Sequence, residues 1–122
     1  MGISTNGLTK PYTAGATIAA RRIVKFGAAD GAVIQAAAAT DKLIGISSDL
    51  GTATGERQDV FMIGNVAEVD AGGTITRGDS VTSDASGKAV TATTGQVAVG
   101  KAEVSAVSGD VMTVIVSPHT AA

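Results

Sequence analysis

The residues of this chain that could carry chemistry are few and scattered. His119 is the only histidine among 122 residues, and there is no cysteine. A zinc site normally needs several imidazole or thiolate ligands, and a catalytic triad needs a base held beside a nucleophile. A single histidine beside Pro118 meets neither requirement. We therefore predict that His119 is a solvated residue of a C-terminal tail.

Residues 95–102 (GQVAVGKA) nearly spell a phosphate-binding loop. That motif requires Ser or Thr after its lysine to hold magnesium, and it lies between a strand and a helix. Here Ala102 follows Lys101, and the intervening Val-Ala-Val favours a strand. We predict a strand that bends at Gly100 and no nucleotide site.

Asp79 and Asp84 frame a polar segment that could suggest calcium binding. Counted from Asp79, an EF-hand loop would need glycine at the sixth position and an acid at the twelfth, where this chain has Asp84 and Val90. An Asx turn explains Asp84 better. Residues 77–79 spell the integrin tripeptide Arg-Gly-Asp, but turn geometry already accounts for all three.

The remaining titratable residues show no pairing suited to general acid–base catalysis. No base–nucleophile or metal set can be assembled from the sequence, so we predict no enzyme activity, no metal and no cofactor. A small carbohydrate- or metal-binding β module is a rival interpretation. It predicts a pocket with aromatic side chains, and the chain has only Tyr12, Phe26 and Phe61.

The composition argues against nucleic acid and membranes as partners. The net charge is −2 and the isoelectric point is about 5.1, whereas a nucleic-acid-binding protein normally shows a basic face with stacking aromatics. We expect the one basic cluster, Arg21, Arg22 and Lys25, to be solvated on a strand. No apolar run approaches the roughly 18 residues of a membrane span, and no signal-peptide core is present. We expect synthesis in the cytoplasm.

Short strands dominate the expected structure. Residues 64–90 alternate apolar pieces with Gly-Gly, Gly-Asp and Ser-Gly turns, and the whole chain reads as eight or nine strands with turns every 8–12 residues. That spacing is typical of an all-β sandwich or barrel. At most one helical turn fits, around residues 74–77. We predict an all-β fold with a small barrel.

We expect one β domain over residues 14–118, with an extended N-terminal arm over 1–13 and a short tail over 119–122. Residues 111–116 (VMTVIV) are apolar at both strand faces, which predicts burial on both sides, either within the domain or in a subunit interface. Most apolar residues are small aliphatics, each contributing at most about 1.5–3 kcal/mol. Such a thin core would gain from burial between subunits.

Several glycine-centred segments follow one another in a familiar order. They are residues 22–25 (RIVK), 43–46 (LIGI), 64–69 (GNVAEV), 75–79 (ITRGD), 85–90 (ASGKAV) and 97–102 (VAVGKA), with a closing apolar strand up to Pro118. Over about residues 14–118 this pattern resembles the small capsid decoration, or cement, proteins of tailed bacteriophages. Each segment is weak alone, and their order and spacing carry the resemblance.

The resemblance implies a β-tulip or small β-barrel fold, trimers on the outside of the phage head and no enzyme activity. It implies the major capsid protein as partner and the virion as location, with stabilisation of the capsid against internal DNA pressure. It supplies no defined set of binding residues. The arm of similar proteins orders on the capsid, so we expect capsid contacts from the arm residues Ile3, Leu8, Pro11 and Tyr12. The alternative is another phage structural or adhesion module, from a tail or spike.

Overall fold

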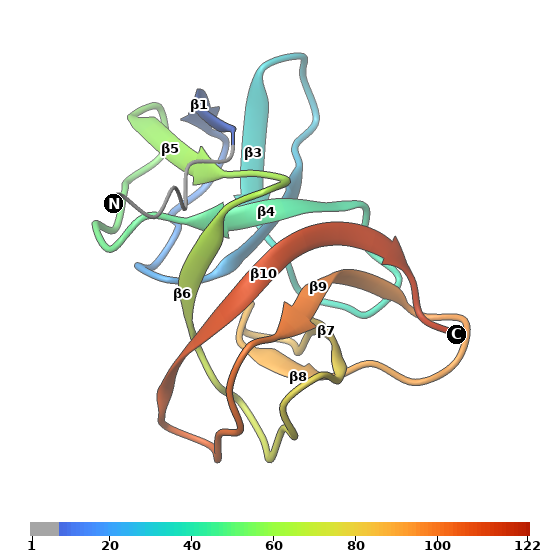
Figure 1. Ribbon diagram of the computed structural model, residues 1–122. Coiled ribbons are helices and arrows are strands. Elements are labelled where there is room, and N and C mark those ends of the chain that lie inside the picture. The colour runs from blue at the N-terminus through green and yellow to red at the C-terminus, as the bar shows by residue number, and fades with distance from the viewer. Residues whose placement is uncertain (1–7) are drawn as a thin grey trace.

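The computed structural model describes residues 8–122, which form ten β-strands and no helix (Figure 1). The strands are β1 (Thr9–Ala14), β2 (Ile23–Phe26), β3 (Ala32–Gln35), β4 (Leu43–Ser47), β5 (Arg57–Phe61), β6 (Val66–Asp70), β7 (Ser80–Ser83), β8 (Ala89–Thr91), β9 (Val97–Ala102) and β10 (Val111–Thr120). The all-β prediction is confirmed. The helical turn allowed around residues 74–77 is absent, because Ile75 there bridges Ala106 instead.

The first five strands close into a barrel in the order β1-β3-β2-β4-β5. β1 pairs parallel with β3 and antiparallel with β5, where Thr9 lies opposite Phe61 and Thr13 opposite Arg57. The barrel therefore includes residues that the sequence assigned to the arm. A strand is needed there because β3 and β5 would otherwise both leave an unpaired edge.

The last five strands form a second sheet in the order β6-β10-β9-β7-β8, with antiparallel neighbours throughout. β10 is its longest strand and lies between β6 and β9, beside which it runs in Figure 1. The register of β10 against β9 shifts between Val116 and His119. Beyond this irregularity, pairing with β9 resumes at His119 and Thr120, so it extends into the expected tail.

β4 joins the two parts because both of its faces are buried. Ile44 belongs to the core cluster inside the barrel, together with Val24, Val33 and Val60. Leu43 and Ile46 belong to the larger cluster that includes the second sheet. β4 therefore supplies side chains to both cores.

β10 differs from its prediction. Met112, Val114 and Val116 face the core, whereas Val111 and Ile115 are 52% and 44% exposed. Of the two outcomes foreseen for residues 111–116, burial on both sides within the domain is wrong. The second sheet has β10 covered by the core on one face only, as antiparallel sheets commonly are.

The strand expected to carry Arg21, Arg22 and Lys25 includes only the last of the three. It begins at Ile23, since the backbone of Arg21 turns into the left-handed region with φ of 53°. This conformation costs a non-glycine residue roughly 1–2 kcal/mol. Backbone hydrogen bonds from Arg21 N to Ser48 O and from Asp70 N to Arg21 O hold it, at 2.9 and 3.1 Å.

Candidate functional site

His119 lies in β10 and is half-buried, so the prediction of a solvated tail residue is wrong. Its Nδ1 lies 2.6 Å from the carbonyl oxygen of Ser117, and its Nε2 lies 2.9 Å from Ser80 Oγ. Because a carbonyl only accepts, a neutral ring donates from Nδ1 and accepts from the Ser80 hydroxyl at Nε2. Neither side chain lines the two grooves described below. The pair links β10 to β7.

The other chemical motifs are turns and strands, as predicted. Asp84 Oδ1 accepts hydrogen bonds from the amides of Ser86 and Lys88 at 2.8 and 2.9 Å, which is an Asx turn. Asp79 Oδ2 accepts from the Thr76 amide at 3.0 Å, across a turn in which Gly78 has φ of 91°. Among residues 8–122, no three His, Asp or Glu side chains gather to hold a metal ion.

The basic cluster is paired and not simply solvated. Arg21 Nε and Arg22 Nη2 lie 3.0 and 3.3 Å from the two carboxylate oxygens of Asp70, which belongs to β6. Lys25 Nζ lies 3.2 Å from Asp41 Oδ1. Sequence reasoning missed these pairs because each partner is distant along the chain.

The pKa of Asp41 is displaced from its ordinary value in the folded chain. Burial raises its pKa, but the amide of Ala37, the ammonium of Lys25 and the amide of Ala38 together outweigh that effect. The pKa therefore lies below its ordinary value of 3.8. The two amides donate to Asp41 Oδ2 at 2.9 and 3.0 Å, so the carboxylate orders the loop between β3 and β4.

An apolar groove lies where the barrel meets the end of β10. Its volume is about 270 Å³, and it is lined by Leu43, Ile44, Met62, Ile63 and Pro118. Leu8 adjoins this groove, since its amide donates to the Ile63 carbonyl at 3.2 Å and its carbonyl accepts from the Met62 amide at 2.7 Å. The side chains of Leu8 and Ile63 are 53% and 59% exposed, and we call these two residues the rim of the apolar groove.

The expected contact residues of the arm have different surroundings. Leu8 is exposed on the rim, and Pro11 is exposed on β1. Tyr12 is half-buried and packs against the barrel core, with its hydroxyl 3.7 Å from Met62 Sδ. Ile3 lies outside the described residues. The sequence did not single out Ile63, because it ends an apolar run, residues 60–63 (VFMI), whose local pattern indicates only a strand.

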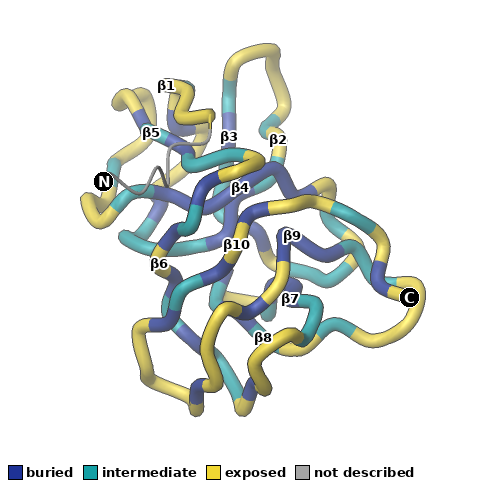
Figure 2. Tube along the Cα trace, in the orientation of Figure 1, coloured by how far each residue is buried: buried dark blue, intermediate teal, exposed yellow. Residues whose placement is uncertain are grey.

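A second exposed surface lies on the outer side of β10. Val111 and Ile115 face away from the core, with Glu68 and Lys101 from the neighbouring strands on the same side. Between them, Thr113 Oγ1 donates to a Glu103 carboxylate oxygen at 2.6 Å. We call this surface the β10 face. Over residues 111–116 buried positions alternate with exposed or half-buried ones, and Figure 2 shows this banding along β10.

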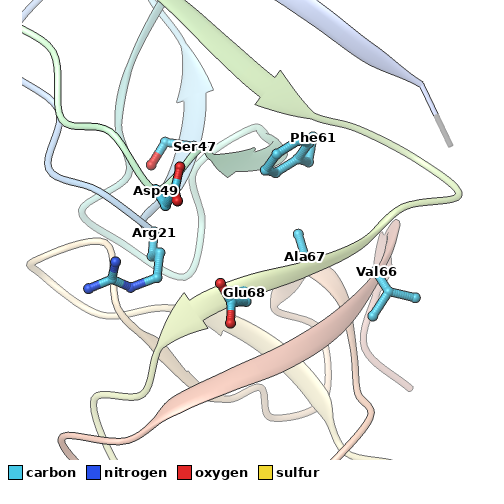
Figure 3. A pocket seen from close by; sticks show the side chains of 7 residues that line it. All are labelled: Arg21, Ser47, Asp49, Phe61, Val66, Ala67 and Glu68. Carbon is cyan, nitrogen blue, oxygen red and sulfur yellow. The ribbon is translucent and has the colours of Figure 1, made fainter. Parts of the chain in front are cut away.

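A third feature, the edge groove, runs between β6 and the barrel (Figure 3). Its volume is about 270 Å³. Val66, Ala67 and Glu68 of β6 form one wall, and the lining residues from the barrel side are Arg21, Ser47, Asp49 and Phe61. β6 is the first strand of its sheet and has β10 as its only strand neighbour.

Residues 8–122 contain no helix that could span a membrane.

A family model described as phage cement protein matches residues 3–118. Among solved structures, the head fiber gp8.5 N base of bacteriophage phi29 is similar, with a TM-score of 0.68 and 22% sequence identity, over 90% of this chain and 93% of that one. At this identity the likeness establishes the fold. A comparison with curated proteins finds no match.

Proposed function

Because the chain belongs to the phage cement protein family, we propose that it binds the outer surface of the phage capsid as a trimer and stabilises the capsid lattice against the pressure of packaged DNA. A protein that binds the assembled lattice and not its separate subunits shifts the equilibrium towards assembly. Three linked binding surfaces add avidity through their effective concentration. The family implies a structural role without catalysis.

The observation that carries this proposal is the exposed rim of the apolar groove. Leu8 and Ile63 stand more than half exposed beside a groove whose lining is apolar. Contiguous apolar surface of this kind marks an interaction site. Leu8 belongs to the segment expected to contact the capsid, and Pro11 and Tyr12 follow it on β1. We assign capsid contact to this end of the barrel.

We assign contact between subunits to the β10 face. Val111 and Ile115 lie four residues apart on the exposed side of β10. Charged residues of both signs, Glu68 on β6 and Lys101 on β9, lie beside them. An apolar centre with a charged rim is the usual anatomy of a protein interface. This arrangement separates the surface that binds the lattice from the surface that joins the subunits.

The test mixes purified protein with undecorated heads and measures bound protein by sedimentation. We expect Leu8→Asp and Ile63→Asp each to weaken binding roughly tenfold or more, because a charge replaces an apolar anchor. Val107→Asp is the matched control, since Val107 is 55% exposed in the β9–β10 loop at the opposite end of the second sheet. Equal losses in all three variants, or wild-type protein that ignores heads, would contradict the proposal.

Subunit contact is tested separately by light scattering. We expect wild-type protein to have the mass of three chains and Ile115→Lys to be monomeric, with an unchanged melting temperature. A wild-type monomer, or a trimer that survives Ile115→Lys, would remove the β10 face from the interface. Imaging of labelled particles separates a head protein from a tail or spike protein.

A further inference from the structure

We propose that the open edge of β6 receives an extended, basic segment of the capsid protein, which adds to the second sheet as a further strand inside the edge groove. This inference rests on the proposed function and identifies where, and in which conformation, the capsid partner docks. Strand addition to an exposed sheet edge is a recurrent way to recognise a peptide.

On the side of β6 that faces away from β10, the backbone groups of Val66 and Glu68 are left without a strand partner in the described chain. The Val116 amide donates to the Asn65 carbonyl, and the Ala71 amide donates to the Asp110 carbonyl. In an antiparallel pair, successive residues alternate between facing the partner strand and facing away. With Asn65 and Ala71 facing β10, the backbone groups of Val66 and Glu68 therefore point to the opposite side. Within residues 8–122 the structure gives those groups no backbone partner.

The edge is already used once within the chain. The Asp70 amide donates to the Arg21 carbonyl at 3.1 Å, and the Arg21 side chain is fixed to Asp70 by the ion pair. Arg21 therefore occupies the last position of the edge and lines the end of the edge groove. An added strand would take the two positions that remain, beside Val66 and Glu68. The wall formed by Ser47, Asp49 and Phe61 confines it from the barrel side (Figure 3).

The charges of the groove select a basic occupant. Glu68 and Asp49 are exposed and line the groove, and the structure gives neither carboxylate a cationic side-chain partner among the described residues. The one cation of the lining, Arg21, is held in an ion pair with Asp70, which Arg22 outside the lining also contacts. A lysine or arginine on the incoming segment would therefore meet two unpaired carboxylates, and such complementarity orients and accelerates association.

Two occupants from this protein itself fit less well. If the β6 edges of two copies paired antiparallel about the middle of the strand, Glu68 would lie opposite Glu68. Like charges placed directly opposite destabilise a strand pair. Residues 1–7 (MGISTNG) contain no lysine or arginine and offer no side-chain counter-charge. A basic segment from the capsid protein meets both requirements.

Glu68→Pro tests the proposal, with Glu68→Gln as its matched control. Proline removes the open N–H and places its ring in the groove, and it is tolerated where an edge N–H faces outward. We expect Glu68→Pro to keep its melting temperature but to bind undecorated heads roughly tenfold more weakly or worse. Because Glu68 also borders the β10 face, the trimer mass is measured for both variants and head binding is compared at equal trimer content. Glu68→Gln keeps the N–H, so we expect a loss of only about twofold to fivefold, with a weaker dependence on salt.

Amide hydrogen exchange on unaltered protein gives a second measurement. We expect the Val66 and Glu68 amides to exchange freely in the free trimer and about tenfold or more slowly on heads. Normal head binding by Glu68→Pro would overturn the inference and leave the proposed function intact, whereas wild-type protein that binds no heads would overturn the proposed function itself. A trimer that Glu68→Pro loses and Glu68→Gln keeps would assign the edge to a second copy. Protection in the free protein that disappears on deletion of residues 1–7 would assign it to the chain's own N-terminus, and either result would overturn the inference.

Discussion

The barrel and the second sheet contain five strands each, but only the barrel closes. In the barrel every strand has two neighbours, because β5 returns to pair with β1. The second sheet ends at β6 and β8, and the β8 edge is partly covered where the Gly72 amide donates to the Ala89 carbonyl. The β6 edge faces a groove. The same number of strands therefore produces one self-contained unit and one with an open side.

This difference suggests distinct roles for the two parts, with the closed barrel as a scaffold and the open sheet as the part available to partners. A closed barrel leaves no unpaired ladder, which removes the usual route to edge-to-edge association. The second sheet keeps an exposed edge and an exposed apolar face on β10, and a central charge on β6 at Glu68 discourages self-pairing. The barrel contributes a wall of the edge groove and the rim of the apolar groove. The two grooves to which we assign capsid contact thus lie where the closed unit meets the open one.

The largest expected effect comes from two glycines, one in the barrel and one in the second sheet, that each lie against a backbone carbonyl of a neighbouring strand. A Cβ on Gly45 of β4 would overlap the Phe61 carbonyl, and one on Gly100 of β9 would overlap the Ile115 carbonyl. Overpacking costs typically 1–3 kcal/mol, and a backbone group cannot swing aside. We expect Gly45→Ala and Gly100→Ala each to lower the free energy of unfolding by about 3 kcal/mol or more, measured by urea denaturation.

Gly73→Ala is the control for this pair. A Cβ there would meet Val90 Cγ1 at 3.6 Å, an ordinary contact. Since β4 belongs to both cores, we expect a single unfolding transition in each variant. Two transitions, with Gly100→Ala moving only one of them, would show that barrel and second sheet unfold separately, and would deepen the contrast between them.

These glycines lie in segments that the sequence marked correctly as strands. Residues 43–46 and 97–102 place glycine between aliphatics, and that local pattern is enough to predict a strand. The pattern does not predict β1, whose identity depends on pairing with β5 nearly fifty residues away. It also misses the break at Arg21, because arginine is not a residue that favours the left-handed region.

A smaller effect is expected from Asp70, which ties β6 to the barrel through Arg21 and Arg22. The three side chains are only 18–31% exposed, so this ion pair is less screened than a surface pair. We expect Asp70→Asn to lower the free energy of unfolding by about 1–2 kcal/mol. It should also speed exchange of the backbone amide at position 70, which donates to the Arg21 carbonyl, because Arg21 loses its ion pair with this residue.

Asp59→Asn is the matched control for Asp70→Asn. Asp59 pairs with Arg57 at the same 3.0 Å, but these side chains are 44% and 72% exposed. We expect a change below about 0.5 kcal/mol, as for exposed pairs generally. Equal losses in the two variants would mean that the link between the parts is not stronger than a surface ion pair.

The candidate surfaces were less accessible to sequence reasoning than the fold was. Leu8 was identified because it is an apolar residue in a segment without strand periodicity. Ile63 on the rim and Glu68 on the edge sit within apolar or alternating runs, so local pattern predicts only their strand. Their exposure depends on which strand becomes an edge, and that is set by the long-range order β6-β10-β9.

The smallest expected effect concerns the loop that Asp41 orders, whose Ala39 carbonyl accepts from Val97 of the second sheet at 2.9 Å. Because the pKa of Asp41 is lowered in the folded protein, its contribution to stability is complete above the unfolded value and is lost as pH falls through the folded one. We expect Asp41→Asn to cost less than about 1 kcal/mol at neutral pH. The gap to wild type should hold down to about pH 4 and narrow only below it. If the difference in free energy of unfolding between the two proteins persisted in stronger acid, the geometry of the loop, and not the charge of the carboxylate, would link the barrel to the second sheet.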